Sequence, residues 1–479
     1  MTLHRNLLIL LALTLTTSFV AAQERGYSWE ATSLNGKLLQ SNLGRMVAHP
    51  TDPNILYLCT IASLDPVTGT PGPGDGLWTT SNAGTTWSKL SDTALAPDAE
   101  IMDVAVCASA PNTLLVGTKE DGVFRSTDGG TSWTAINAGL GFPNANLGAV
   151  AVAMNPNNSN IIYASVAQTA GFDLLNPSPN HPGFFYSQDG GASWTSNNAG
   201  LPARYDSTAD FKSRTGVAAS IVVLPQSPNY VLLGMIDVNI NTVILFGSKK
   251  ATSSGQVFYS SNSGAGTFQK ANTGLPTGIN QSNSLGTSTA RIASSTMILT
   301  AATGPKAAVW ASHTGLTFDI DLGGNALVNN RSKGIFFTKN GSWGARNTGL
   351  PYISSWTDPA SNSSLTLKIV DATPAGAVGI GTGPAFQACL VGSLRSDAGD
   401  SSSNNTKVYG SLDSGKSGWM KSWDSGLDSS PTLAYTEANA NLIVFNADMS
   451  YAFATIQWSD AAVTTPLSDD DGVYRLQIQ

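Results

Sequence analysis

An eight-residue phrase that recurs along the chain constrains its fold more than any other feature. The clear copies span residues 80–87, 126–133 and 187–194. Each copy has Ser or Thr first, Asp or Asn third, Gly fifth and Trp eighth. Weaker copies span residues 260–268, 338–343 and 411–419. Such internal repetition predicts an architecture built from copies of one structural unit.

A short apolar and aromatic run precedes each copy of the phrase, usually after a glycine. Upstream of several runs lie two further strand-like segments joined by a Pro or Asn turn, as in residues 46–57 and 150–163. Each unit therefore predicts four antiparallel strands, the composition of a propeller blade. The sequence predicts an all-β fold, a single seven-bladed β-propeller of four-stranded antiparallel blades. The seven runs are residues 76–78, 122–124, 183–185, 255–258, 334–336, 407–409 and 472–474.

The two ends of the chain predict how the ring closes. The chain finishes on a third strand at residues 472–476, while residues 27–30 look like a fourth strand without a blade. Pairing of these N-terminal and C-terminal strands would complete the last blade and leave no open edge. We therefore expect one propeller domain over residues 23–479.

Residues 1–22 have the pattern of a signal peptide. An apolar stretch from Leu7 to Val20 ends at the small residues Ala21 and Ala22, before Gln23. This pattern predicts export and cleavage. We expect a secreted, extracellular protein, or a periplasmic one in a Gram-negative bacterium. No other segment reaches the length of a spanning helix, so no membrane span is expected after cleavage.

Charge and cysteine content narrow the possible partners and cofactors. The net charge of −7 argues against nucleic acid as a partner, because phosphate binding needs clustered Lys and Arg. Three cysteines cannot all pair within one chain. Cys59 and Cys107 lie in apolar runs, so we expect buried free thiols, with a disulfide between them as the alternative. The sequence contains no metal-ligand spacing or cofactor motif, and we expect neither.

The recurring phrase resembles the Asp-box, also called the bacterial neuraminidase repeat. The resemblance is specific at Asp128 and Asp189 and weaker at Asn82 and Asp413. The Asp or Asn oxygen is expected to accept backbone N–H groups within a tight turn. The tryptophans of the phrase are expected to bury against the neighbouring sheet, which makes all these residues structural. These tryptophans are Trp87, Trp133, Trp194 and Trp419.

Over nearly the whole chain after residue 22, the sequence resembles exported glycosyl-hydrolase-like and sortilin-like repeat proteins. Families with this repeat include xyloglucan-cleaving hydrolases, sialidases, the sortilin N-terminal domain and photosystem II assembly factors. The opening phrase at residues 44–57 carries the resemblance, together with residues 76–81. Neither enzyme family's catalytic set carries over. The first inner strand opens on Leu43-Gly44-Arg45 without an Asp, and the Arg-Ile pair at Arg291 is followed by Ala293.

Loop lengths predict which face of the propeller carries the function. Turns between third and fourth strands share one face, and the other connections, which are long here, share the opposite face. Long loops crowded on one face are typical of a functional side, with surface decoration as the alternative. The longest is expected over residues 301–333, and the others over residues 63–75, 168–182, 202–215, 237–254, 276–289 and 351–363.

A glycosidase needs two carboxylates that face each other across the sugar. Asp103 opens the second inner strand, where its side chain could point into the central channel, and Asp210 lies in a loop that enters the fourth. We name Asp103 and Asp210 as catalytic candidates. The alternative is that they are ordinary solvated or capping carboxylates.

Other candidates would bind substrate. Arginines at the starts of inner strands would hold a carboxylate or uronic acid bidentately, or form salt bridges with nearby Asp. Loop histidines with a tyrosine and an arginine would suit a polysaccharide lyase, and exposed tryptophans would stack on sugars or pack loops. The candidates are Arg45, Arg214, Arg291, His181, His313, Tyr205, Trp310 and Trp356.

These patterns favour a secreted, carbohydrate-facing propeller, glycoside-hydrolase-like or glycan-binding, with a polysaccharide or glycan partner. The alternative is a non-catalytic protein–protein interaction scaffold of sortilin-like type, and a polysaccharide lyase is a further one. Two channel-facing carboxylates would favour the enzyme. A channel lined by Arg, Ser and apolar groups would favour the scaffold.

Overall fold

A computed structural model gives the protein's structure, and every regular element in the residues it describes is a β-strand. The described part contains no helix with the length and hydropathy needed to cross a bilayer. The described residues are 28–34, 41–62, 74–143, 147–168, 183–202, 206–208, 211–242, 252–253, 256–276, 279–280, 288–301, 309–321, 326–330, 334–338, 341–347, 352–353, 373–374, 377–382, 389–393, 408–411, 416–417, 437–459 and 472–478.

The first three sheets each contain four antiparallel strands that pair in chain order. The first contains β2 (Ser41–Ala48), β3 (Leu56–Ala62), β4 (Leu77–Thr80) and β5 (Ser88–Leu90). The second contains β6 (Ile101–Cys107), β7 (Ala110–Thr118), β8 (Val123–Ser126) and β9 (Thr134–Ala135). The third contains β10 (Leu147–Asn155), β11 (Asn158–Gln168), β12 (Gly183–Ser187) and β13 (Thr195–Ser196). In each sheet the fourth strand begins directly after the tryptophan of the repeated phrase.

The next two units repeat this plan but are joined into one sheet. The fourth unit contains β15 (Phe211–Val223), β16 (Val231–Thr242), β18 (Val257–Ser260) and β19 (Gln269–Lys270). The fifth contains β21 (Ser288–Ala301), β22 (Val309–Asp321), β24 (Gly334–Thr338) and β25 (Gly344–Ala345). The join is an antiparallel pairing of β16 with β21, from Ile236 opposite Thr296 to Thr242 opposite Ala290.

Smaller strands extend the joined sheet and flank it. β14 (Asp206–Thr208) pairs with β15, and β23 (Ala326–Asn330) pairs with β22. Two separate two-stranded sheets pair β17 (Thr252–Ser253) with β20 (Ile279–Asn280), and β26 (Tyr352–Ile353) with β27 (Thr373–Pro374).

The last two sheets complete the described structure. One contains β28 (Ala377–Thr382), β29 (Cys389–Ser393) and β30 (Val408–Ser411). The other contains β31 (Glu437–Phe445), β32 (Tyr451–Ser459), β33 (Gly472–Gln477) and β1 (Glu30–Ala31). Glu30 lies opposite Arg475, so the N-terminal segment pairs with the last strand, as the sequence predicts.

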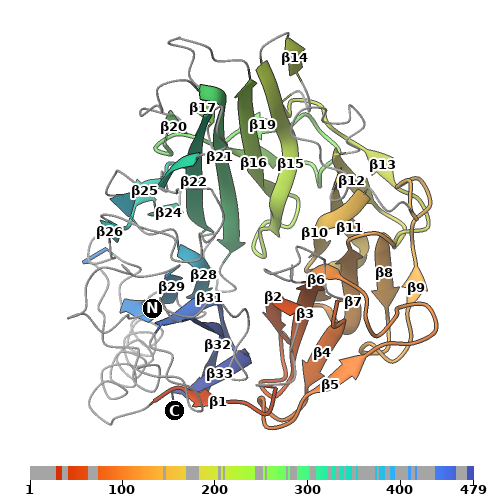
Figure 1. The fold of residues 1–479 in the computed structure, drawn as a ribbon. Coiled ribbons are helices and arrows are strands. Elements are labelled where there is room, and N and C mark those ends of the chain that lie inside the picture. Colours follow the sequence, from red (N-terminus) through yellow and green to blue (C-terminus); the bar gives the residue numbers. More distant parts are fainter. Residues whose placement is uncertain are drawn as a thin grey trace, which may run out of the picture.

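The sheets stand around a common centre, each with its first strand innermost (Figure 1). First strands of successive sheets contact one another from β2 through β6, β10 and β15 to β21, and β31 contacts both β28 and β2. Radial four-stranded antiparallel sheets of this kind make a β-propeller. The predicted all-β propeller fold and its four-stranded antiparallel sheets are confirmed.

The core lies between neighbouring sheets. Tyr57 and Leu77 of the first sheet, for example, pack with Val104, Leu114 and Trp133 of the second. Equivalent clusters join the second sheet to the third, the third to the fourth unit, and the fourth unit to the fifth. The tryptophan of the repeated phrase therefore buries against the preceding sheet, because only that sheet offers an apolar face on its side.

The long connections predicted over residues 202–215, 237–254 and 301–333 are a partial error, because strands β14, β15, β16, β22 and β23 extend into these ranges. Within residues 276–289, the strands that the structure describes are β20 and the first two residues of β21. The missed signal is in β22, where Leu316, Phe318 and Ile320 alternate with polar residues, which is the period of a strand. Pairing between strands satisfies the backbone polar groups there, so these connections are shorter than the sequence suggested.

Candidate functional site

The repeated phrase forms a turn in which its acidic side chain has only internal partners. Asp128 Oδ1 accepts hydrogen bonds from Ser126 Oγ at 2.8 Å and from Ser132 N at 2.9 Å. Its Oδ2 accepts one from Ser132 Oγ at 2.6 Å. These bonds favour the ionised form and lower the pKa of Asp128 to about 2. The carboxylate is held as a turn acceptor and is not positioned as an acid or base.

The other two clear copies of the turn use the same bonds. Asp189 accepts hydrogen bonds from Ser187 Oγ and from Ser193 N and Oγ, and its pKa also lies well below the ordinary value. Asn82 Oδ1 accepts from Thr80 Oγ1 and Thr86 N at 3.0 and 2.8 Å. An amide therefore replaces the carboxylate without loss of the turn, so charge is not required. Asp413 and Trp419 lie outside the described residues.

The tryptophans of the phrase are buried, and two of them bond across the sheets. Trp194 Nε1 donates to Ile136 O of the preceding sheet at 2.6 Å, and Trp343 Nε1 makes the same bond to Ala271 O at 2.6 Å. Trp133 Nε1 donates to Gly130 O in its own turn at 3.1 Å. Trp87 is buried as well. Trp194 and Trp343 thus fasten their sheets to the preceding one by hydrogen bonds, whereas Trp87 and Trp133 do so through the packing of their rings.

One face of the propeller, which we call the turn face, carries two kinds of tight turn. These are the turn of the repeated phrase, between the third and fourth strands, and the hairpin turn between the first and second strands. The repeated turn donates backbone N–H groups to the hairpin turn between the first and second strands. Gly129 N donates to Asn112 O, Gly190 N to Asn160 O, and Ser263 N to Asn229 O, at 2.8–2.9 Å. The remaining connections lie on the opposite face, which we call the connection face.

A second repeated phrase, Asn-Ala/Thr-Gly-Leu, caps the third strands. Asn137 Oδ1 accepts a hydrogen bond from Val123 N at 2.8 Å, and the Oδ1 atoms of Asn198, Asn272 and Asn347 accept the equivalent bond. A Cβ on Gly122 would lie 2.3 Å from Asn137 Oδ1, so the Gly before the strand leaves room for the cap. The two repeated phrases are thus complementary parts of one structural unit.

Among the predicted catalytic and binding residues, Asp103 has the most described contacts. It lies on β6, and its side chain is only 2% exposed. Its Oδ2 accepts a hydrogen bond from Val152 N on β10 at 2.9 Å, and its Oδ1 accepts one from Val104 N at 2.8 Å. Arg45 Nε of β2 lies 3.1 Å from Oδ1. One carboxylate therefore links the first strands of three successive sheets.

The electrostatics at Asp103 follow from its burial. Desolvation raises the pKa of this carboxyl, opposed by Arg45 and by the two backbone N–H groups. The same burial raises the pKa of the Cys59 thiol, which senses both charges. Arg45 keeps 28% of its side chain exposed. The salt bridge weighed for the arginines is present here, and Asp103 is sealed from substrate by its partners.

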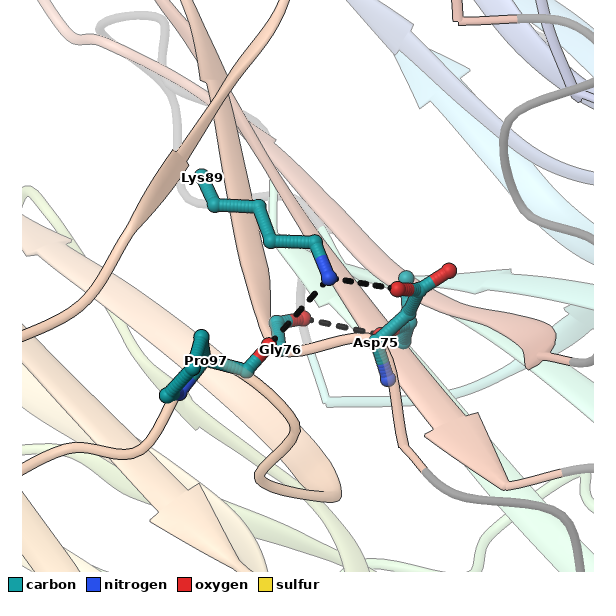
Figure 2. A network of polar contacts seen from close by, with 5 residues as sticks. Asp75, Gly76, Lys89 and Pro97 are labelled. Carbon is teal, nitrogen blue, oxygen red and sulfur yellow. Dashed lines mark hydrogen bonds and ion pairs between the residues drawn. The ribbon is translucent and has the colours of Figure 1, made fainter.

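Two further ion pairs lie on the connection face of the first two sheets. Lys89 Nζ is 2.6 Å from Asp75 Oδ1 and also donates to Pro97 O, as Figure 2 shows. Lys119 Nζ is 2.5 Å from Glu100 Oε2. Each charge already has a partner of opposite sign, so neither pair resembles a free acid–base couple.

Two candidates predicted to be exposed in loops are buried instead. Trp310 and His313 lie on β22 and are both 0% exposed, and the Trp310 ring packs 4.7 Å from Phe337. They pack inside because the segment predicted as a loop is the second strand of the fifth unit. The predicted exposure of both side chains in a loop is therefore wrong.

The other candidates are placed less fully. Arg214 lies on β15, opposite Val238, and Arg291 lies on β21, opposite Asp319. All three predicted arginines are therefore on first strands, though only Arg45 has a described side chain. Asp210, His181, Tyr205 and Trp356 lie outside the described residues, and their predicted roles stay predictions.

Cysteine and metal chemistry add no site within the described residues. Cys59 and Cys107 are both free and buried, as expected, so the alternative disulfide does not form. Among the residues that the structure describes, no group of His, Cys, Asp and Glu is arranged to hold a metal ion.

No protein-family model and no curated protein matches this chain. Its structure is similar to YCF48 bound to D1 peptide, with a TM-score of 0.44, 10% identity, and 95% of this chain and 96% of that chain covered. It is also similar to the GH74 xyloglucanase from Xanthomonas campestris, with a TM-score of 0.32, 14% identity and coverage of 92% and 76%. A third similar structure is that of the RRP9 WD40 repeats, with a TM-score of 0.43, 7% identity, and 94% of this chain and 99% of that chain covered. At these scores the likenesses carry no inference about partner or chemistry.

Proposed function

We propose that this chain is a closed, seven-bladed propeller of Asp-box type that serves as a non-catalytic interaction scaffold. Support for seven blades comes from the third strands and from the pairing of β1 with β33. All seven runs predicted as third strands lie in or overlap a strand. These strands are β4, β8, β12, β18, β24, β30 and β33.

The observation that carries the scaffold proposal is the state of Asp103. A glycosidase acid or nucleophile must reach the glycosidic bond. The Asp103 carboxylate instead accepts hydrogen bonds from two backbone N–H groups and forms an ion pair with Arg45. Its side chain is also buried from solvent. Among the described side chains of the first strands β2, β6, β10, β15 and β21, Asp103 is the only carboxylate. This composition favours binding over hydrolysis.

The scaffold's partner is proposed to be a protein that docks on the connection face, where the Arg45 side chain is 28% exposed. We keep export, with loss of residues 1–22, as part of this proposal. The glycan-binding and lyase readings become outcomes of the test, since no described residue on this face favours them.

The test is release of reducing ends, or of unsaturated sugars, from a polysaccharide panel by the folded protein. We expect none from the wild type. Release that is abolished in Asp103→Asn, but kept in the exposed control Asp98→Asn on the same face, would overturn the proposal. A pull-down with wild type and Arg45→Ala then identifies the partner, which we expect to be lost in the variant.

A further inference from the structure

A single large apolar side chain is exposed among the described residues, and it lies on the turn face. Tyr230 is 41% exposed and directly precedes β16, at the end of the hairpin turn from β15. A lone exposed apolar side chain is common on protein surfaces. Tyr230 is distinguished instead by how its ring is held and by the side chains beside it.

The Tyr230 ring is held rigidly from behind. It stacks on Tyr259 at 6.2 Å between centroids, with only 14° between the ring planes. Tyr259 packs against the cluster between the fourth and fifth units, and its hydroxyl donates to Gln269 Oε1 at 2.7 Å. A ring fixed in this way loses little conformational entropy when a ligand covers its outer face.

The backbone under Tyr230 is also fixed. Tyr230 N donates to Ser227 O at 2.8 Å, and Leu224 N donates to Tyr230 O at 3.1 Å. Asn155 Nδ2 of the third sheet donates to Pro228 O at 3.2 Å, which ties the turn to the neighbouring sheet. The platform is thus preorganised in the free protein.

The side chains around the platform are polar and mostly uncharged. Ser263 Oγ donates to Asn229 Oδ1 at 3.2 Å, and Gln269 is exposed on the outermost strand. Lys270 is the neighbouring cation, and its side chain points to the opposite face of β19 from Gln269 because strand residues alternate. An aromatic face with an amide and hydroxyl rim matches a neutral sugar, which offers an apolar C–H face and a ring of hydroxyls.

The other sheets show what this position looks like without a platform. The position of Tyr230 is taken by Ile55 in the first sheet and Ile161 in the third, both half-buried. In the last sheet it is Tyr451, but there the Arg475 guanidinium lies 5.5 Å from the ring centroid. The first, third and last sheets thus fill or cover the position that the fourth unit leaves open.

From this we infer that Tyr230 and Tyr259 form a binding platform for a neutral sugar residue of a polysaccharide. The site is on the turn face, so it is separate from the scaffold function proposed for the connection face. The failure of one proposal leaves the other standing.

The test is affinity electrophoresis of the full chain in gels that contain mixed-linkage β-glucan, galactomannan or hydroxyethyl cellulose, with anionic polygalacturonate as the charge control. We expect retardation by at least one neutral polymer and about tenfold weaker binding for Tyr230→Ile, as loss of an aromatic contact would cause. Tyr230→Phe should keep binding within about twofold.

Isoleucine is the natural residue at this position in the first and third sheets, so Tyr230→Ile is expected to fold. Tyr451→Ile is the matched control and should bind like the wild type. No retardation of the wild type by any neutral polymer would overturn the inference, and so would equal binding by wild type and Tyr230→Ile. Binding to polygalacturonate alone would also overturn it.

Discussion

The first three sheets and the joined fourth and fifth units use the same four-strand plan, but they are connected differently. First and second strands run for 7 to 11 residues in the first three sheets and for 12 to 14 residues in the joined pair. In the first three sheets, neighbours meet through side chains, side-chain hydrogen bonds and single backbone hydrogen bonds, such as the one from Ser109 N to Pro156 O at 2.8 Å. In the joined pair, a ladder of paired backbone adds to that contact.

The difference arises where the edge of β16 changes partner. From Val231 to Gly234 the strand pairs with β18, the third strand of its own unit. From Ile236 onward it pairs with β21 of the next unit. Met235 stands between, with its N–H donated to Gln256 O at 2.9 Å. A second strand that outruns the third strand of its unit leaves unpaired polar groups, and pairing with the next unit satisfies them.

The largest loss of stability is expected at Asp103, because its side chain joins sheets that have no backbone ladder between them. Asp103→Ala leaves two buried N–H groups and Arg45 without an acceptor, and should lower the free energy of unfolding by about 4 kcal/mol. Ser220 occupies the equivalent place beside the ladder, accepting from Leu299 N at 2.9 Å, so Ser220→Ala should cost only about 1 kcal/mol. Urea denaturation measures both. Equal losses would contradict the comparison.

A smaller effect is expected from two matched glycines on second strands. A Cβ on Gly234 would lie 2.2 Å from Met297 O, and one on Gly117 would lie 2.5 Å from Ala149 O. The β16–β21 ladder fixes the spacing of the joined units, so Gly234→Ala should lower the free energy of unfolding by about 3 kcal/mol. Gly117→Ala should cost about 1 kcal/mol, because separate sheets shift apart more easily. Thermal unfolding of the pair distinguishes them, and a larger loss at Gly117 would show that the ladder does not stiffen the interface.

Removal of an asparagine cap should lower the free energy of unfolding equally in both regions. Asn137→Ala in the second sheet and Asn272→Ala in the fourth unit each remove the acceptor of a third-strand N–H group. Each substitution should lower the free energy of unfolding by about 1 kcal/mol, as measured in urea. A clear difference between the two would mean that the joined pair does not share the structural unit of the first three sheets.

The smallest effect is expected in the pH dependence of stability, through Asp128 in the turn of the second sheet. The pKa of Asp128 is lowered in the folded state from its ordinary value of 3.8 to about 2. The stability that it contributes is therefore complete above its unfolded pKa and is lost as the pH falls from 3.8 towards 2. Asp128→Asn should reduce the pH dependence of the unfolding midpoint in that window, as Asn82 already holds its turn with an amide. An unchanged acid limb in the variant would contradict this role.

Much of the fold could be predicted because its signals are short. The turn at Asp128 closes between Ser126 and Ser132, and the cap at Asn137 reaches a strand that begins 14 residues before it. The arginines were placed on first strands correctly, and the salt bridge weighed for them is present at Arg45. Trp310 and His313 were misplaced because β22 was taken for a loop, although its alternating pattern was visible.

The sequence by itself determined the repeating unit, because turns, caps and strand starts depend on residues close together in the chain. The tertiary structure decided which residues of neighbouring units meet and which side chains stay exposed. Asp103 meets Val152, 49 residues away, and the second strand of the fourth unit pairs with the first strand of the fifth. Tyr230 is exposed while Tyr451 is covered by Arg475. Such contacts depend on how neighbouring sheets approach one another, and no local pattern of residues encodes that distance.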